Sequence, residues 1–307
     1  MGPFAALVLA MAFFSFKSDR VLDAQNLSLV LQQVMVVGVL AIGQTLIILT
    51  AGIDLSCGTV MAFGQIVMTK LAVANGIPPL EALALGVLVC VGFGLLNGAL
   101  VTGIRLPAFI VTLGTLNIAF ALTHIVSNDL TFSDLPKLLL FFGRTFEVAG
   151  AEVTYGVVVM LVLYGFIWYA LTQTAWGRHV YAVGDNPEAA RLTGIKVNRV
   201  LLSVYTIAGL MYGIAAWLLV SRTEIGDPNA CQTTENLDSI TAVVLGGTSL
   251  FGGRGTVIGT LIGAIIVGVF RNGLTIIGVE VIYQYLVTGI LVILAVSVDQ
   301  LTHRKST

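Results

Sequence analysis

The chain has 307 residues, of which 57% are hydrophobic and 10% are charged, and its formal net charge is −1. Soluble domains carry about a quarter charged residues, so this composition excludes an ordinary soluble domain and indicates a membrane protein. A nucleic-acid partner is not expected, because no basic groove is visible in so weakly charged a chain. The three cysteines, Cys57, Cys90 and Cys231, have neither disulfide nor metal-site spacing.

Nearly charge-free windows recur along the whole chain. A helix needs about 20 apolar residues to cross about 30 Å of hydrocarbon, so the windows predict an all-α polytopic protein that forms a single transmembrane domain over residues 1–307. The first window lacks a basic lead and a cleavage pattern, which favours a retained helix over a signal peptide. The first, eighth and ninth windows have the shortest charge-free cores, which leaves a break or kink near their glycines open. The ten predicted crossings are 2–16, 27–50, 57–74, 80–102, 106–127, 153–172, 200–220, 238–250, 256–276 and 281–298.

The basic residues predict an orientation. If ten crossings alternate, eight basic residues fall in the connections on one side and five on the other, and the richer side is expected to be cytoplasmic. Four of the eight lie in one short loop, residues 173–199. Both termini are then predicted to lie in the cytoplasm. The eight residues are Arg105, Arg178, Arg191, Lys196, Arg199, Arg254, Arg304 and Lys305.

A short polar helix is predicted inside this loop, over the stretch "DNPEAARLTG" (185–194). Asn186 can cap the helix, and Pro187 suits its first position, where a missing N–H costs nothing. Glu188 complements the positive end of the helix dipole. Gly194 can take the left-handed conformation that ends a helix.

Two helical turns are marginal by themselves, so this helix is expected to pack against something. Ala189 and Ala190 offer a small, flat face that another protein can approach closely. The alternative is an ordinary interfacial connector between two crossings.

The loop and three other stretches resemble one known family. "GRHVYAVGDNPEAARLTGIKVNRV" (177–200) is similar to the cytoplasmic loop of permease subunits from ribose-type monosaccharide ABC importers, including the Glu-Ala-Ala...Gly element that docks on the ATPase subunit. The resemblance extends from about Leu27 to Asp299. The other stretches are "LTAGIDLSCGTV" (49–60), "LPAFIVTLGT" (106–115) and "LDSITAVVLGGTSLFGGRGTVIGTLIGA" (237–264).

This resemblance implies a type II ABC importer-like bundle of about ten helices in the bacterial inner membrane. The chain would be a non-enzymatic subunit in contact with lipid, and it would pair with a second permease subunit as a homodimer. A separate cytoplasmic ATP-binding subunit would use ATP and Mg²⁺, so no cofactor is expected in this chain, and a periplasmic sugar-binding protein would deliver the substrate. The residues implied in ATPase coupling are Asp185, Asn186, Pro187, Glu188, Ala189, Ala190, Arg191, Gly194 and Arg254.

The glycine-rich run "GGTSLFGGRGT" (246–256) has two glycines, Gly247 and Gly252, at the spacing of a phosphate-binding loop. The next residues are Gly253 and Arg254 where that loop needs Lys and then Ser or Thr, and no strand precedes the run. We therefore interpret it as a tight cytoplasmic turn, with Arg254 as its exposed group.

Four polar residues are candidates for the solute path or for structural links within the bundle: Asp54, Ser56, Asn97 and Asn117. An ionisable group such as Asp54 between apolar spans is a functional candidate, including for proton coupling. The favoured alternative is that Asp54 or Ser56 caps the following helix. Polar amides at mid-span either face a cavity or link helices.

His124 and several aromatic residues are weaker candidates for the path, since aromatics near span ends more often anchor a protein at the interface. The aromatics are Tyr164, Trp168, Tyr169, Tyr205, Tyr212 and Trp217.

Two other classes of function stay open. An ion-coupled secondary transporter would want paired charges in the membrane, and Asp54 and Arg271 are the candidates. A membrane anchor would recruit a cytoplasmic partner without transport. Within the importer class, permeases for branched-chain amino acids and for nucleosides have related architecture and are the nearest alternatives.

Overall fold

The computed structural model describes residues 2–148, 150–232 and 235–304, and these residues are mostly helical. Two strands, β1 (Thr145–Val148) and β2 (Ala151–Thr154), form an antiparallel hairpin with Thr145 opposite Thr154. Short turns of 3₁₀ helix occur at η1 (Asp19–Leu22), η3 (Phe141–Gly143) and η4 (Pro228–Gln232), and η2 (Leu100–Ile104) is a π-helical turn. The α-helices are α1 (Gly2–Lys17), α2 (Ala24–Leu49), α3 (Cys57–Val73), α4 (Pro79–Ala99), α5 (Ala108–Ser127), α6 (Tyr155–Gln173), α7 (Ala175–Asp185), α8 (Pro187–Leu192), α9 (Val197–Thr223), α10 (Glu235–Leu245), α11 (Val257–Ile276) and α12 (Val281–Arg304).

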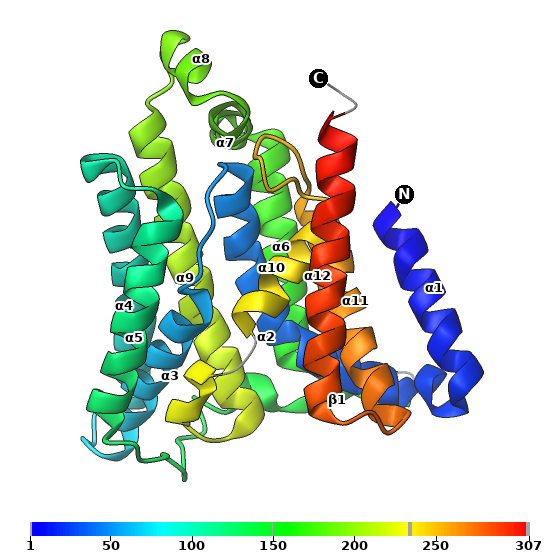
Figure 1. The fold of residues 1–307 in the computed structure, drawn as a ribbon. Helices are drawn as coiled ribbons and strands as arrows, with labels where there is room; N and C mark the ends of the chain where they lie inside the picture. The colour runs from blue at the N-terminus through cyan, green and yellow to red at the C-terminus, as the bar shows by residue number, and fades with distance from the viewer. Residues whose placement is uncertain (1, 149, 233–234, 305–307) are drawn as a thin grey trace.

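Helix α2 is the centre of the bundle. Its residues from Val34 to Leu49 are all buried, and α6, α9, α10 and α11 pack around it (Figure 1). Two glycines permit this close packing: the space beside Gly38 is filled by Met160 of α6, and the space beside Gly43 by Tyr212 of α9.

The outer helices face lipid. Only about a third of the apolar windows of α4, α5 and α6 is buried, against 83% of that of α2, although these helices are about as apolar as α2, and this is the pattern expected of a protein surrounded by hydrocarbon. In the part of the chain that the structure describes, six helices are long and apolar enough to cross a membrane, and Gly2–Lys17, Cys57–Val73 and Val281–Leu291 are shorter apolar segments. The polytopic helical architecture is therefore present, and the count of about ten crossings stays a prediction.

The structure corrects the crossing expected over 238–250. Helix α10 has 11 residues and is about 16 Å long at 1.5 Å per residue, which is about half the thickness of the hydrocarbon core. The chain breaks at Gly246 and Gly247 and enters an irregular loop before α11. Helix α3 is also short and begins near mid-height of the bundle, and the linker from α2 descends through the protein to reach it (Figure 1).

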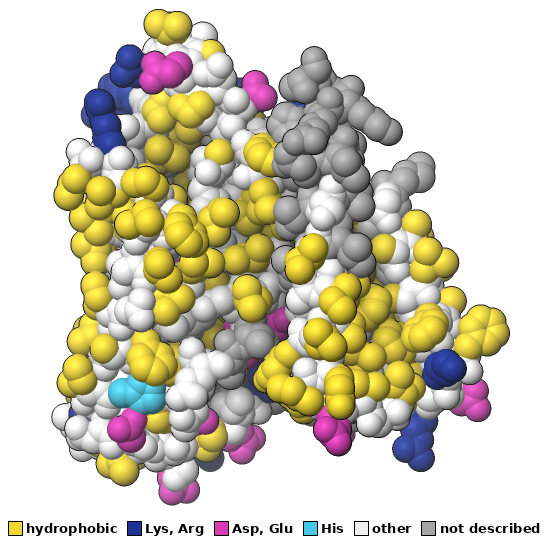
Figure 2. Space-filling model, viewed as in Figure 1, with side chains coloured by type: hydrophobic (Ala, Val, Ile, Leu, Met, Phe, Trp, Pro, Cys, Tyr) yellow, Lys and Arg dark blue, Asp and Glu magenta, His cyan; other side chains and the backbone are white. Residues whose placement is uncertain are grey.

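The two ends of the molecule differ. Helices α7 and α8 project at one end, and the N-terminal end of α1 and the C-terminal end of α12 point the same way (Figure 1). In the view of Figure 2, basic side chains gather beside α8 with a few acidic ones, apolar side chains cover the middle, and several acidic and some basic side chains lie at the opposite end.

Helices α4 and α9 pack closely against each other, and glycines make this possible. A Cβ atom added at Gly94 of α4 would lie 2.3 Å from the Tyr205 carbonyl oxygen of α9, and one added at Gly209 of α9 would lie 2.5 Å from the Cys90 carbonyl oxygen of α4. Such small-residue contacts are a common basis of helix association in membranes, because the hydrophobic effect does not drive helices together within lipid and close van der Waals packing does.

We predict that Gly94→Ala destabilises the protein, because its methyl group must push α9 away. The overpacking should cost about 1–3 kcal/mol and lower the melting temperature in detergent. Gly92→Ala on the same helix is the control, since a Cβ there meets nothing within 4 Å and alanine is the better helix former by about 1 kcal/mol. Equal melting temperatures for the two variants would contradict this account of the helix pair.

Candidate functional site

Helix α8 has the local structure that its sequence predicts. The side-chain Oδ1 of Asn186 accepts a hydrogen bond from the Ala189 amide at 3.0 Å, and Pro187 occupies the first turn. The chain leaves the helix through Gly194 at φ 89°. The sequence did not predict α7, the longer helix before it, whose first turn is capped by Thr174 through the Gly177 amide at 3.2 Å.

The surface that α8 presents differs in part from the expected one. Ala190 is 4% exposed and packs inward, so it is not available to another protein. Leu192, which the sequence analysis left out, is 86% exposed at the tip of the molecule. The exposed residues of α8 and its flanks are Asp185, Asn186, Pro187, Glu188, Ala189, Arg191, Leu192, Thr193 and Gly194, with Glu188 and Arg191 paired at 3.4 Å.

The glycine-rich loop 246–256 is an irregular connection between α10 and α11, and it lies against α7. Four of its glycines, Gly247, Gly252, Gly253 and Gly255, have φ between 69° and 147°, a backbone conformation that few other residues adopt. Arg254 is exposed beside them.

The end of α7, the end of α2 and this loop meet at one junction. The Leu49 carbonyl oxygen at the end of α2 accepts a hydrogen bond from the Gly253 amide at 2.9 Å. A Cβ added at Gly184 of α7 would lie 1.7 Å from that same oxygen, so the two backbones are in direct contact. The Tyr181 hydroxyl donates a hydrogen bond to the Gly255 carbonyl at 2.9 Å, and burial raises the pKa of this phenol, which keeps it a donor.

A buried polar network lies just beyond this junction, in the linker between α2 and α3. Asp54 is 1% exposed. Its Oδ1 accepts hydrogen bonds from the Ser56 amide at 2.7 Å and the Ser56 hydroxyl at 2.6 Å, and its Oδ2 accepts one from the Tyr212 hydroxyl of α9 at 3.0 Å. The Tyr212 donor ties the linker to α9, the two Ser56 donors fix the linker's own turn, and together they satisfy a carboxylate that would otherwise be costly to bury.

Asn97 belongs to the same network, and Asn117 does not. The Asn97 amide donates to the Ser56 hydroxyl at 3.2 Å, and Gln44 of α2, which the sequence analysis did not single out, donates to the Asp54 carbonyl. Asn117 is exposed on α5 and donates to its own helix at Leu113 O, 2.9 Å away. Three of the four predicted polar candidates therefore meet, in a packed cluster rather than an open channel.

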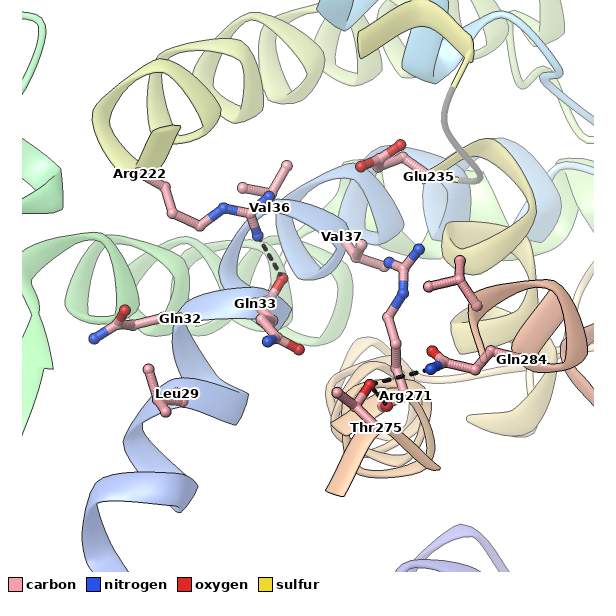
Figure 3. Close-up of a pocket in the computed structure, with 11 residues that line it drawn as sticks. Leu29, Gln32, Gln33, Val36, Val37, Arg222, Glu235, Arg271, Thr275 and Gln284 are labelled. Atoms are coloured by element: carbon pink, nitrogen blue, oxygen red, sulfur yellow. Dashed lines mark hydrogen bonds between the residues drawn. The ribbon is translucent and has the colours of Figure 1, made fainter. Parts of the chain in front are cut away.

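A polar pocket opens in the other half of the bundle, toward the end opposite α8. It has a volume of about 560 Å³ and lies between α2, α9, α10, α11 and α12. Figure 3 shows Arg222, Glu235 and Arg271 entering it from three different helices. The other polar residues in its wall are Gln32, Gln33, Thr275 and Gln284.

The charges in and around this pocket are balanced. The Arg271 guanidinium pairs with Asp238 of α10 at 3.2 Å, and that of Arg222 donates to the Gln33 carbonyl at 3.4 Å. The Glu235 carboxylate lies within the electrostatic reach of both guanidinium groups. Two positive and two negative side chains thus meet at the first turn of α10.

Most of the residues that line this pocket were not predicted from the sequence. Polar residues inside apolar windows, such as Gln32 and Gln33 in α2, could have indicated a polar site. The sequence does not indicate which helices are neighbours, so these residues could not be assigned to one pocket. None of the aromatic residues predicted for the path is among the described residues that line the pocket. His124 lies elsewhere, paired with Asp129 and 3.4 Å from the Cys231 sulfur.

Comparison with known proteins identifies the family. The family described as "Branched-chain amino acid transport system / permease component" matches residues 26–296. The chain is 45% identical over 304 residues to the fructose import permease of Rhizobium meliloti, and this alignment covers 97% of this chain and 84% of the relative. It is 37% identical to the ribose import permease of Bacillus subtilis over 98% of this chain and 92% of the relative. It is 34% identical to the D-allose transport system permease of Escherichia coli over 98% of this chain and 91% of the relative.

No solved structure matches the chain. The family match nevertheless covers most of the sequence, and these relatives align with nearly all of it. The chain therefore belongs to the family of transport-system permease components, and it is a membrane permease subunit rather than an enzyme.

Proposed function

We propose that this chain is the transmembrane subunit of an ATP-driven importer for a monosaccharide. The observation that carries the proposal is the 45% identity to a fructose permease along nearly the whole chain, together with a capped, exposed helix, α8, at one end of the bundle. The family description names branched-chain amino acids, but the relatives reported above carry sugar names. A sugar is therefore the favoured substrate.

The proposed topology puts α7 and α8 in the cytoplasm of a bacterium, with the chain in the inner membrane. The basic residues beside α8 support this orientation, since cytoplasmic loops are rich in Lys and Arg. Both termini would then also be cytoplasmic. The bundle would cross the membrane about ten times if the shorter segments α1, α3 and α12 are counted and α10 is treated as a broken crossing.

The proposed partners follow from this topology. A separate ATP-binding subunit docks on α8, and this chain holds no cofactor of its own. A periplasmic sugar-binding protein docks at the opposite end, and a second copy of the chain completes the path as a homodimer. Two exposed groups of α8 suit the ATPase contact: the Glu188 and Arg191 pair, and Leu192, whose apolar side chain is otherwise left in water.

We predict that Leu192→Glu weakens association with the ATPase subunit at least tenfold, because a charge replaces an apolar anchor at the contact. A change of this size corresponds to about 1.4 kcal/mol, which is within the range of interface anchors. Co-purification in detergent measures association, and uptake of labelled D-fructose into proteoliposomes measures transport. The control is Leu130→Glu, an exposed leucine in the loop at the opposite end. If Leu192→Glu binds the ATPase and transports like the unsubstituted protein, α8 is a connector and not a docking helix.

The junction of α7 with α2 is the proposed route by which ATPase movement reaches the path. Gly184 precedes α8 by three residues and touches the Leu49 carbonyl of the most buried helix. A movement of α8 and α7 therefore acts directly on α2 and on the loop that carries Arg254.

We predict that Gly184→Ala uncouples ATP hydrolysis from transport. Its methyl group cannot fit 1.7 Å from the Leu49 oxygen, so α7 must separate from α2 while the exposed surface of α8 is unchanged. The ATPase subunit should still co-purify, and uptake should fall at least tenfold relative to Gly165→Ala, a control glycine on α6 with open space beside it. Normal uptake by Gly184→Ala would remove the junction from the coupling route.

Asp54 is proposed as an anchor of the α2–α3 linker and not as a proton carrier, since its carboxylate is engaged by three donors. We predict that Asp54→Asn transports with an unchanged pH profile, because the amide oxygen still accepts from Ser56. Asp54→Ala should lower the free energy of unfolding by about 1–3 kcal/mol, since it leaves buried donors unpaired. Uptake measured from pH 5 to 8, with chemical denaturation in parallel, checks both. A pH dependence that disappears in Asp54→Asn would favour proton coupling.

A further inference from the structure

We propose that the pocket between α2, α9, α10, α11 and α12 is a subsite that binds the hydroxyl groups of a neutral polyhydroxylated solute, such as a monosaccharide, as it passes through the permease. This inference rests on the proposed function and gives it a location. It places recognition by the permease in the half of the bundle opposite α8, with Glu235 as the central acceptor.

The first observation is an incomplete hydrogen-bonding arrangement at Glu235. The residue is 8% exposed, lines the pocket, and its Oε2 has no hydrogen-bond partner among the residues that the structure describes. A buried acceptor of this kind is costly to leave unpaired, and native proteins rarely do so without a reason. A hydroxyl group of a ligand in the pocket would supply the missing donor.

The second observation is that α10 begins at this place, inside the bundle. Glu235 and Asp238 lie in its first turn, and the side chain of the intervening Asn236 accepts a hydrogen bond from the Gly58 amide at the start of α3. Two short helices thus begin side by side within the protein. Irregular backbone at membrane depth is tolerated where it is buried in protein or lines a cavity, and broken helices of this kind form the solute sites of many transporters.

The chemistry of the wall selects the class of ligand. Arg271 pairs with Asp238, and Glu235 lies within the electrostatic reach of Arg222 and Arg271, so the wall carries groups of both signs, and hydroxyl groups can donate to the acidic ones and accept from the basic ones. The side-chain amides of Gln32 and Gln33 can both donate and accept, as can the hydroxyl groups of a sugar. An alkyl side chain such as that of leucine would fill the same space without pairing these groups, which a polar site penalises.

The volume also fits a small solute. About 560 Å³ falls within the range of typical ligand pockets, about 300–1,000 Å³. The wall includes valines of α2, Val36 and Val37, which can pack against the apolar face of a sugar ring while the amides and charged groups bind its edge.

A protection experiment tests occupancy directly. Gln32→Cys places a thiol in the pocket wall, and the native cysteines Cys57, Cys90 and Cys231 are buried. In the complete importer, reconstituted with its ATPase and binding protein, D-fructose or D-ribose should slow the labelling of this thiol by a small thiol reagent at least fivefold, and L-leucine should not. Ser133→Cys, in an exposed outer loop, should be labelled at the same rate with and without sugar.

A second variant tests the role of Glu235. Glu235→Gln keeps the size of the side chain and replaces one acceptor by a donor, so sugar uptake should fall at least tenfold while the complex with the ATPase subunit still assembles. Unchanged uptake by Glu235→Gln together with equal labelling in sugar and in buffer would overturn the inference and leave the importer function intact. Protection by leucine in place of sugar would also overturn it. Absence of sugar uptake by the unsubstituted importer would instead contradict the proposed function, and this inference with it.

Discussion

The contact on which the structure depends most is the one between the Leu49 carbonyl at the end of α2 and the backbone of α7 and the glycine-rich loop. The Leu49 oxygen accepts a hydrogen bond from the Gly253 amide. It also lies so close to Gly184 that no side chain fits between the two backbones. Because backbone touches backbone there, no flexible side chain can absorb a displacement. Helix α2 is buried along most of its length, so it connects this junction to the rest of the bundle as a packed unit.

Both proposed sites lie along that helix. At its C-terminal end are α7, α8 and the Asp54 network, and in its N-terminal half Gln32 and Gln33 enter the polar pocket. The structure thus has an exposed helix, α8, which we propose as the docking helix, and a solute-sized pocket toward opposite ends of one central element. An importer needs such a connection, because the energy released by a partner in the cytoplasm must act on a solute that arrives from the other side.

Much of this architecture could be predicted from the sequence, and the reasons for the failures are physical. The capped helix at Asn186 and Pro187 was predicted because capping is local chemistry. The break of the crossing over 238–250 was only left open, because the length of a helix there depends on what surrounds its first turn. Core and lipid-facing helices could not be distinguished, because α2 and α4 have similar mean hydropathy. A helix that faces hydrocarbon has no polar side that would mark it in the sequence.

The same limit applies to the sites. Ala190 was expected on the surface of α8 because its size suits a contact, but the same small size lets it pack inward. Asp54, Ser56 and Asn97 were correctly singled out as polar groups that need partners, yet Gln44 and Glu235 were not, because their importance depends on neighbours 10 or more residues away.

The central claim of this account is that ATP, and not an ion gradient, moves a sugar through this chain. Uptake of labelled D-fructose into proteoliposomes containing the permease, its ATPase and its binding protein tests it most directly. The account predicts uptake that requires ATP and persists when ionophores remove all ion gradients, whereas uptake that follows an ion gradient without ATP would contradict it.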